Sequence, residues 1–135
     1  METVKAGTIL IDKKTNSVAL VYRERLKDFS FPKGHLEDGE TILECAIRET
    51  AEETKRIAEV VENIGPFIER YTTPRGEKCV VYFYLAFDGG KSDNTSTDTH
   101  DVFWIPFDEV ARKLTHKGSK HLWESVYLAV KDCIE

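Results

Sequence analysis

Alternating hydrophobic and polar residues predict β-strands in two parts of the chain. Residues 6–11 and the segment SVALVYRE (residues 17–24), which follows the turn-prone DKKTN, form a predicted hairpin. Residues 59–73 and 78–87 are rich in β-branched and aromatic side chains and are separated by PRGE. This pattern predicts a second hairpin, whose first arm bends at Gly65-Pro66.

After the first predicted hairpin, apolar residues recur with the spacing of a helix. Thr41 with Glu44 three residues later is a capping-box pattern, which predicts a helix from Ile42 to about Arg56. Its apolar positions cover an arc of about 140°, and this side is expected to face the core.

In the C-terminal part of the chain, the residue pattern predicts a short strand at 101–105, a short helix at 107–115 and a longer helix at 119–134. The apolar stripe of the last helix indicates core packing, although a dimer or ligand surface would show the same stripe. Residues 28–40 and 88–100 are loops by composition. The layout predicts one domain spanning residues 1–135, of the α+β class, with a mixed β-sheet between α-helices.

Composition argues against a membrane protein, a secreted protein and a zinc-binding protein. The chain has 135 residues, 41% hydrophobic and 32% charged, as expected for a globular protein. Its longest apolar run, VVYFYLAF, is too short to span a membrane, and its start shows no secretory signal, so we expect a cytoplasmic protein. Cys45, Cys79 and Cys133 show no metal spacing, which predicts reduced thiols without a disulfide or zinc site.

The net charge of −5 disfavours a long nucleic acid as partner. An anionic ligand would need a local source of positive charge.

The end of the first predicted helix carries a dense group of charges. Glu49, Glu52 and Glu53 lie within an arc of about 100° beside the apolar face, flanked by Arg48 and Arg56. One interpretation is a solvated helix with i,i+4 ion pairs. It leaves three crowded carboxylates unexplained, whereas Mg²⁺ or Mn²⁺ would relieve their repulsion and attract a phosphate ligand.

The spacing of these residues resembles the Nudix box, G-x5-E-x7-R-E-U-x-E-E-x-G-U. Gly34, Glu40 and the run Arg48–Glu53 match six fixed positions within 23 residues. The resemblance implies the Nudix fold over nearly the whole chain. It also implies that Mg²⁺ or Mn²⁺ holds a diphosphate, which is hydrolysed by a metal-activated water.

Motif positions imply individual roles. Glu49, Glu52 and Glu53 would bind the metal, with the backbone carbonyl of Lys33 as a further ligand, and Glu40 and Arg48 would orient them. Related enzymes often place a glutamate where Asp98 stands, six residues before Trp104, as a base or metal ligand. Asp101 and Glu52 are the competing candidates for the base.

The chain departs from the box at three positions. Thr50 replaces an aliphatic residue, Lys55 replaces the glycine that ends the helix, and Arg56 replaces a second aliphatic residue. Because lysine in the left-handed conformation costs on the order of 1 kcal/mol, we expect the helix to continue for about a turn into residues 57–60.

Residues around the box indicate the substrate. The run FPKGH (residues 31–35) is similar to that of diadenosine polyphosphate hydrolases, so Lys33 and His35 could meet phosphate oxygens. Tyr71 lies where that group carries a tyrosine. The side chains proposed to stack on a base are Tyr71, Tyr82 and Tyr84, and those proposed to reach outer phosphates are Arg70, Arg75 and Lys78. Cross-strand packing and surface charge are the alternative interpretations.

The expected function is Mg-dependent hydrolysis of a nucleoside-linked diphosphate, with a diadenosine polyphosphate as first candidate. Alternatives are an oxidised nucleoside triphosphate hydrolase, a diphosphoinositol polyphosphate hydrolase and an inactive nucleotide sensor. We expect a small nucleotide as partner, no membrane, and a monomer or homodimer.

Overall fold

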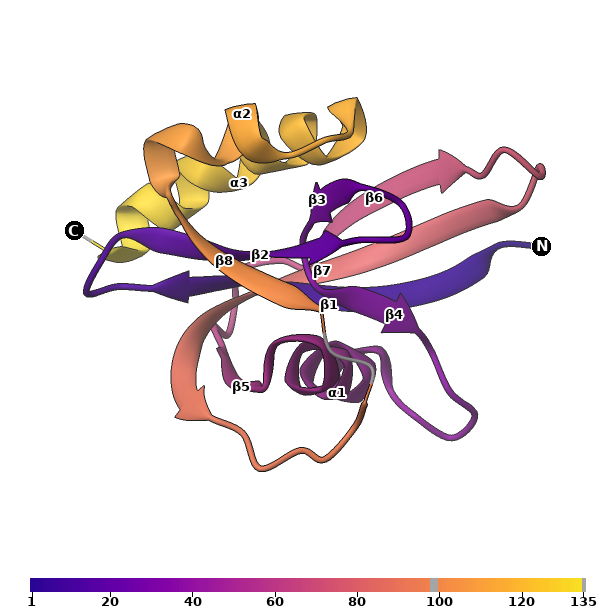
Figure 1. Ribbon diagram of the computed structural model, residues 1–135, viewed down its shortest axis with the longest axis horizontal. Coiled ribbons are helices and arrows are strands. Elements are labelled where there is room, and N and C mark those ends of the chain that lie inside the picture. The colour runs from indigo at the N-terminus through magenta and orange to yellow at the C-terminus, as the bar shows by residue number, and fades with distance from the viewer. Residues whose placement is uncertain (98–99, 135) are drawn as a thin grey trace.

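The computed structural model describes residues 1–97 and 100–134, and it confirms the α+β fold with a mixed sheet between helices. In Figure 1, α1 lies on one face of the sheet and α2 and α3 on the other. The strands are β1 (Thr3–Asp12), β2 (Ser17–Arg23), β3 (Asp28–Ser30), β4 (Lys33–His35), β5 (Arg56–Val60), β6 (Phe67–Thr72), β7 (Lys78–Lys91) and β8 (Asp101–Pro106). The helices are α1 (Ile42–Thr54), the 3-10 turn η1 (Phe107–Glu109), α2 (Val110–Lys113) and α3 (Lys117–Ile134).

The central strands run in the order β3-β2-β1-β7-β5, with β4 on β1, β6 on β7 and β8 on β2. β1 and β7 are parallel, and the other pairs are antiparallel. The second predicted hairpin is confirmed as β6 and β7. The first is confirmed only at its turn, where Ile11 pairs with Val18 and Asp12 with Ser17, because the rest of β1 pairs with β4 and β7.

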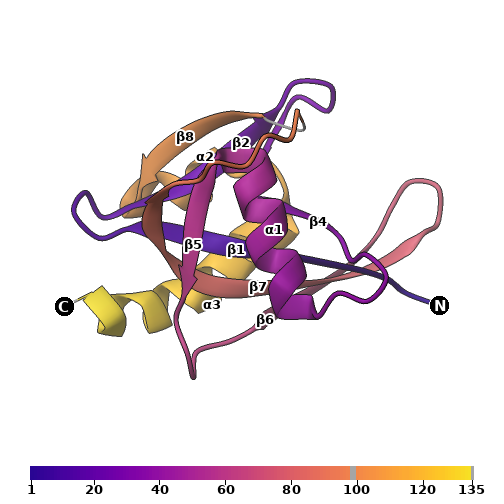
Figure 2. The ribbon, with the colours of Figure 1, turned by 90° about the horizontal axis from the view of Figure 1, so that it is seen from below.

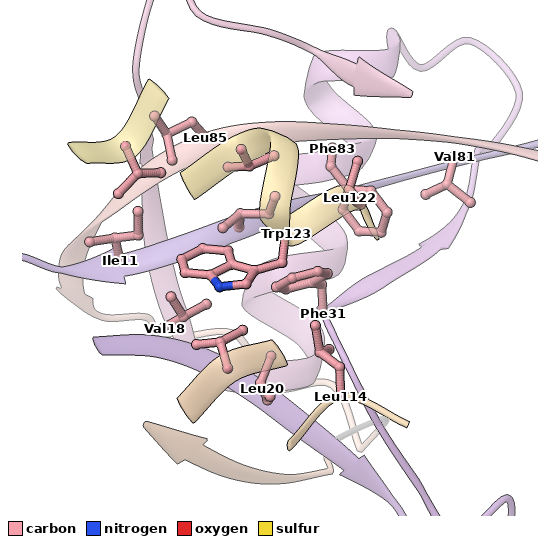
Figure 3. Close-up of a cluster of buried hydrophobic side chains, with 14 residues drawn as sticks. Ile11, Val18, Leu20, Phe31, Val81, Phe83, Leu85, Leu114, Leu122 and Trp123 are labelled. Atoms are coloured by element: carbon pink, nitrogen blue, oxygen red, sulfur yellow. The ribbon is translucent and has the colours of Figure 1, made fainter. Parts of the chain in front are cut away.

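The two faces of the sheet have different coverings. On the α3 face, Ile9 and Ile11 of β1 pack with the odd-numbered residues of β7, such as Phe83, and with Trp123 of α3. Figure 3 shows this core, with the Trp123 ring among the strand side chains. On the α1 face, Ala6 packs against the helix. Side chains alternate along each strand, so odd-numbered residues of β1 and β7 face α3 and even-numbered ones face α1.

Several predicted boundaries are wrong. Residues 28–40 are not all loop, since β3 and β4 form there through pairing with β2 and β1. The loop predicted at 88–100 begins only after Lys91, because β7 continues along β5. The helix predicted at 107–115 is η1 followed by α2, and the last helix begins at Lys117 instead of residue 119.

The predicted extension of the first helix is also wrong. α1 begins with the predicted Thr41–Glu44 capping box but ends at Thr54, and Lys55 adopts the left-handed conformation with φ 60°. Its backbone N–H donates to Ala51 O, and its ammonium donates to the carbonyl of Ser96. These contacts hold a lysine where glycine is usual, and Arg56 then starts β5. Figure 2, seen from the α1 side, shows β5 beside the helix.

The buried face of α1 is rotated from the predicted one. Thr50 of the predicted apolar arc is buried, but Leu43 and Ile47 of the same arc are 40% and 37% exposed. Glu49 and Glu53 are buried instead. The Thr50 hydroxyl lies 2.7 Å from the hydroxyl of Thr8 on β1, so this departure from the box replaces an aliphatic contact with a buried hydrogen bond. The helix therefore presents acids, as well as small residues, to the sheet.

Two of the three predicted thiols can be placed. Cys45 and Cys79 are free and buried, whereas the side chain of Cys133 lies outside the described part of the chain. Among the described residues, no helix has the length and apolar character needed to cross a bilayer.

Candidate active site

Two buried carboxylates of α1 lie against the sheet. Glu49 and Glu53 are 6% and 7% exposed, and their four-residue spacing places both on one side of the helix. Glu52 lies beside them and is 22% exposed at its side chain. The three acids predicted as metal ligands therefore occupy the edge between α1 and the sheet.

β4 passes directly over one of these acids. A Cβ at Gly34 would lie 1.6 Å from Oε2 of Glu49, so any side chain there would occupy the position of the carboxylate. The thiol of Cys45 is 3.7 Å from the Gly34 carbonyl, which it faces as a weak donor. The first position of the box is glycine because β4 and the buried acid need the same space.

Arg48 connects the preceding loop with the acids. Its Nε and Nη2 donate to the two carboxylate oxygens of Glu40 at 2.5 and 3.0 Å, and Nη1 donates to Oε2 of Glu52 at 3.0 Å. Nη2 also donates to the carbonyl of His35 at 2.9 Å. The hydrogen bonds from Arg48 lower the pKa of Glu40 to about 2. Arg48 thus links Glu40 to Glu52 of α1 and to β4.

Glu53 connects the end of α1 to β4 and to the segment before β8. Its Oε1 accepts the backbone N–H of Lys33 at 3.0 Å, and its Oε2 lies 3.6 Å from Nε2 of His100. His100 is a residue that the sequence analysis did not identify. Its position directly before the predicted strand at 101–105 was the available signal, but nothing in the sequence indicated that this loop reaches α1.

The electrostatics of the acids favour a bound cation. Burial holds the pKa of Glu49 well above its usual value, and the carboxylates of Glu52 and Glu53 raise it further, against the opposing effect of Arg48. Carboxylate oxygens are suitable ligands for Mg²⁺ or Mn²⁺. As they lie, no three acidic, histidine or cysteine side chains among residues 1–97 and 100–134 form a ready-made ion site. The acids are instead engaged with Arg48 and the Lys33 amide.

Cations gather on the α3 face of β1 and β4, opposite the face that Gly34 turns toward Glu49. Lys5 pairs with His35 and Gly7 with Lys33, so Lys5, Lys33 and His35 lie on the face of Gly7. Burial, together with the charges of Arg23 and Lys5, lowers the pKa of Lys33 to about 8. Lys5 and Arg23 were missed because both lie outside the box, although each is a charge at the end of an otherwise apolar strand.

Tyr71 of β6 adjoins these cations. Its hydroxyl accepts a hydrogen bond from Nζ of Lys5 at 2.9 Å, and Nζ of Lys33 lies 5.9 Å from its ring centroid. Lys33, His35 and Tyr71 therefore share one face of the sheet with the cations.

The other predicted substrate residues lie on the opposite face. Tyr82 and Tyr84 pair with Ala6 and Thr8 of β1, and they pack in the cluster formed with α1. By the same alternation, Arg70 and Lys78 share this face, and Arg70 is paired with Glu2 at 3.1 Å. The predicted binding residues thus divide between the two faces of the sheet. Those on the α3 face are Lys33, His35 and Tyr71, and those on the α1 face are Arg70, Lys78, Tyr82 and Tyr84.

Two of the three candidates for the base lie in the described part of the chain. Asp98 lies outside the described residues. Asp101 begins β8, is exposed and pairs with Tyr22 of β2. Of the three candidates, Glu52 lies directly within the group of acids described above.

Arg23, Asp28 and His116 form a second ionic group. Asp28 is 3% exposed, and its carboxylate accepts hydrogen bonds from Nε and Nη2 of Arg23 at 2.8 and 2.6 Å. Nε2 of His116 lies 2.8 Å from Asp28 Oδ2. This group holds the end of the β2–β3 hairpin against the segment before α3.

Comparison with known proteins identifies relatives of the chain. The family model described as NUDIX domain matches residues 1–126. The chain is 34% identical over 98 residues to a protein named MutT4 from Mycobacterium tuberculosis, covering 71% of this chain and 40% of that protein. It is 36% identical over 107 residues to an 8-oxo-(d)GTP phosphatase of Mycolicibacterium smegmatis, covering 78% of this chain and 32% of that protein.

The chain therefore spans a third to two fifths of the length of these relatives. Among solved structures, a NUDIX hydrolase from Nitrosomonas europaea superposes with a TM-score of 0.80 at 20% identity. That match covers 96% of this chain and 90% of the other, and it supports the fold.

Proposed function

Because the chain belongs to the Nudix domain family, we propose that it hydrolyses a phosphoanhydride bond in a nucleoside-linked diphosphate with the help of a divalent cation. The observation that carries this proposal is the contact between the buried acid Glu53 and Lys33: Glu53 accepts the Lys33 backbone N–H at 3.0 Å, and its charge acts on the Lys33 ammonium. A phosphate chain carries negative charge that neither group of residues could hold alone. Acids that bind a cation, next to amines that bind phosphate, accommodate both charges.

The donor set fits Mg²⁺ or Mn²⁺. Glu49, Glu52 and Glu53 would hold the ion, with the Lys33 carbonyl as a further ligand, and the ion would neutralise phosphate charge and lower the pKa of a water. Arg48 keeps Glu40 and Glu52 in place through its guanidinium. Gly34 lets the backbone of β4 approach the carboxylate of Glu49.

Proton transfer requires a carboxylate near the attacking water. Glu52 is the candidate that the described geometry favours, because it is more exposed than its two neighbours and already contacts a charged partner. Asp98 and Asp101 remain the candidates that the family pattern suggests.

A diadenosine polyphosphate is the first candidate substrate. Lys33, His35 and Tyr71 support it, since they share one face and resemble the corresponding residues of diadenosine polyphosphate hydrolases. An oxidised guanine nucleotide is the second candidate, supported by the relative that is named 8-oxo-(d)GTP phosphatase. The acidic chain gives less support to a densely anionic diphosphoinositol phosphate.

A substrate panel tests the proposal. Purified protein with Mg²⁺ is incubated with diadenosine tetraphosphate, 8-oxo-dGTP, ADP-ribose and a diphosphoinositol phosphate, and kcat/KM is measured from chromatographic product formation. We expect turnover that is abolished by EDTA and restored by Mg²⁺ or Mn²⁺. Nucleotide binding without any product would favour the sensor function instead.

A further inference from the structure

Glu69 of β6 has a carboxylate that the proposed chemistry does not use. It lines a groove of about 380 Å³ between β6 and α3, whose other walls include Phe67, Leu122 and His121. Glu69 is partly exposed. Burial raises the pKa of its carboxyl group, and the charges of Lys33 and His116 oppose this rise. Within the described part of the chain, this carboxylate has no hydrogen bond and no ion pair. Removing a carboxylate from water without a partner is costly.

The first turn of α3 closes on this carboxylate. A Cβ at Gly118 would lie 2.6 Å from Oε2 of Glu69, so any larger residue at position 118 would contact the carboxylate. The acid is therefore confined between β6 and the helix, with the groove as its open side.

Glu69 lies on the face of the sheet that carries the proposed phosphate-binding residues. Glu69 and Tyr71 are two residues apart on β6, so they lie on the same face of the sheet. Lys33 interacts electrostatically with Glu69 and lies near the Tyr71 ring. A nucleotide with its phosphates at Lys33 and the acids would thus place its base near Tyr71 and Glu69.

We propose that Glu69 recognises the base, by accepting a hydrogen bond from the exocyclic amino group of a purine in the groove between β6 and α3. This inference rests on the proposed function, which supplies the nucleotide. Adenine and guanine each carry one exocyclic amino group, at C6 in adenine and at C2 in guanine. An ionised carboxylate complements the adjacent N–H groups of guanine, and a protonated one complements the amino group and N1 of adenine.

Matched nucleotides without the amino group test this role by binding alone. Calorimetry in the presence of Mg²⁺ compares AMP with purine riboside 5′-monophosphate, and GMP with IMP. These monophosphates have no phosphoanhydride bond, so binding is measured without hydrolysis. We expect the analogue without the amino group to bind about 10- to 100-fold more weakly in at least one pair, because its base would cover the carboxylate without forming a hydrogen bond to it. The pair that shows the difference identifies adenine or guanine as the base.

Variants assign the effect to this side chain. Glu69→Leu should bring the two members of the sensitive pair within about twofold of each other, whereas Glu69→Gln, which keeps an acceptor oxygen, should retain part of the difference. Glu62→Gln, an exposed loop change, serves as the matched control and should bind as the wild type does. Circular dichroism confirms that each variant is folded.

Equal affinities within both pairs for the wild type, no measurable binding, or full discrimination by Glu69→Leu would overturn the inference. These outcomes are distinct from failure of the proposed function. Turnover of a polyphosphate without base discrimination removes only the role of Glu69. Base discrimination without turnover of any substrate removes only the proposed activity.

Discussion

The carboxylate of Glu53 accepts the backbone N–H of Lys33 at 3.0 Å, which joins the last turn of α1 to the first residue of β4. The two residues are 20 positions apart in sequence, and their contact brings the acids of the helix to the cations of the sheet. The same carboxylate is therefore both a structural acceptor and a proposed metal ligand.

Glu53→Gln separates these two roles. The amide oxygen can still accept the Lys33 N–H, so the fold should be retained, but the charge that a divalent cation needs is lost. We expect weaker Mn²⁺ binding in a calorimetric titration and a fall of kcat by about two orders of magnitude or more. Glu62→Gln is the control at an exposed position. Near-normal turnover of Glu53→Gln would show that Glu53 is not a metal ligand.

Gly34→Ala tests the contact between β4 and Glu49. Because the added methyl would lie 1.6 Å from the carboxylate, β4 or the acid must move. We expect overpacking to cost about 1–3 kcal/mol of the free energy of unfolding, measured in urea, together with a fall in kcat.

Gly76→Ala is the matched control for this change. Its Cβ would meet no atom within 4 Å, but its φ is +87°. This substitution should therefore cost on the order of 1 kcal/mol through backbone strain and leave kcat unchanged. If Gly34→Ala has the same kcat as the control, the close approach of β4 has no role in catalysis.

Sequence reasoning identified the acids and the second hairpin, because both depend on local spacing. The box positions Glu40, Arg48 and Glu49 follow a fixed motif, and the structure brings their side chains together. The path after α1 was predicted wrongly, since the left-handed Lys55 depends on its contact with Ser96, 41 residues away. Local propensity carries no information about such a contact.

The sequence could not predict that Tyr71 lies on one face of the sheet and Tyr82 and Tyr84 on the other. Tyr82 and Tyr84 were correctly placed on one face of a strand by period 2. Which face this is depends on the parallel pairing of β7 with β1, and on the helix that covers it. The positions of Lys5 and Glu69 likewise follow from strand pairing, that of β1 with β4 for Lys5 and that of β6 with β7 for Glu69.

Tyr71 and Tyr84 should respond differently to substitution by leucine. The Tyr71 ring lies near Lys5 and Lys33, so losing a base-stacking surface should raise KM by about 5- to 100-fold. Tyr84 packs against the α1 side, so Tyr84→Leu should lower the free energy of unfolding more than it raises KM. Steady-state kinetics and urea denaturation of both variants measure the two effects. The reverse pattern would place the base on the α1 face of the sheet.

Asp28 should make stability depend on pH in the acidic range. Burial alone would raise its pKa, but the hydrogen bonds from Arg23 and His116 and their charges lower it below the usual value. A carboxyl group whose pKa is lower in the folded state contributes stability above its unfolded pKa, and this contribution is lost as the pH falls through the folded pKa. The contribution should therefore be complete at neutral pH and decline below about pH 4.

Asp28→Asn measures this contribution. Since the change leaves Arg23 partly covered without its ionic partner, we expect a loss of about 3–5 kcal/mol in the free energy of unfolding at pH 7. Urea denaturation at pH 7, 5 and 3 should show the difference between variant and wild type shrinking at pH 3, while the exposed change Asp108→Asn has little effect throughout. A difference that stays constant from pH 7 to 3 would mean that Asp28 stabilises the protein by packing and not through its charge, and the Arg23–Asp28–His116 group would then be only a set of neighbours.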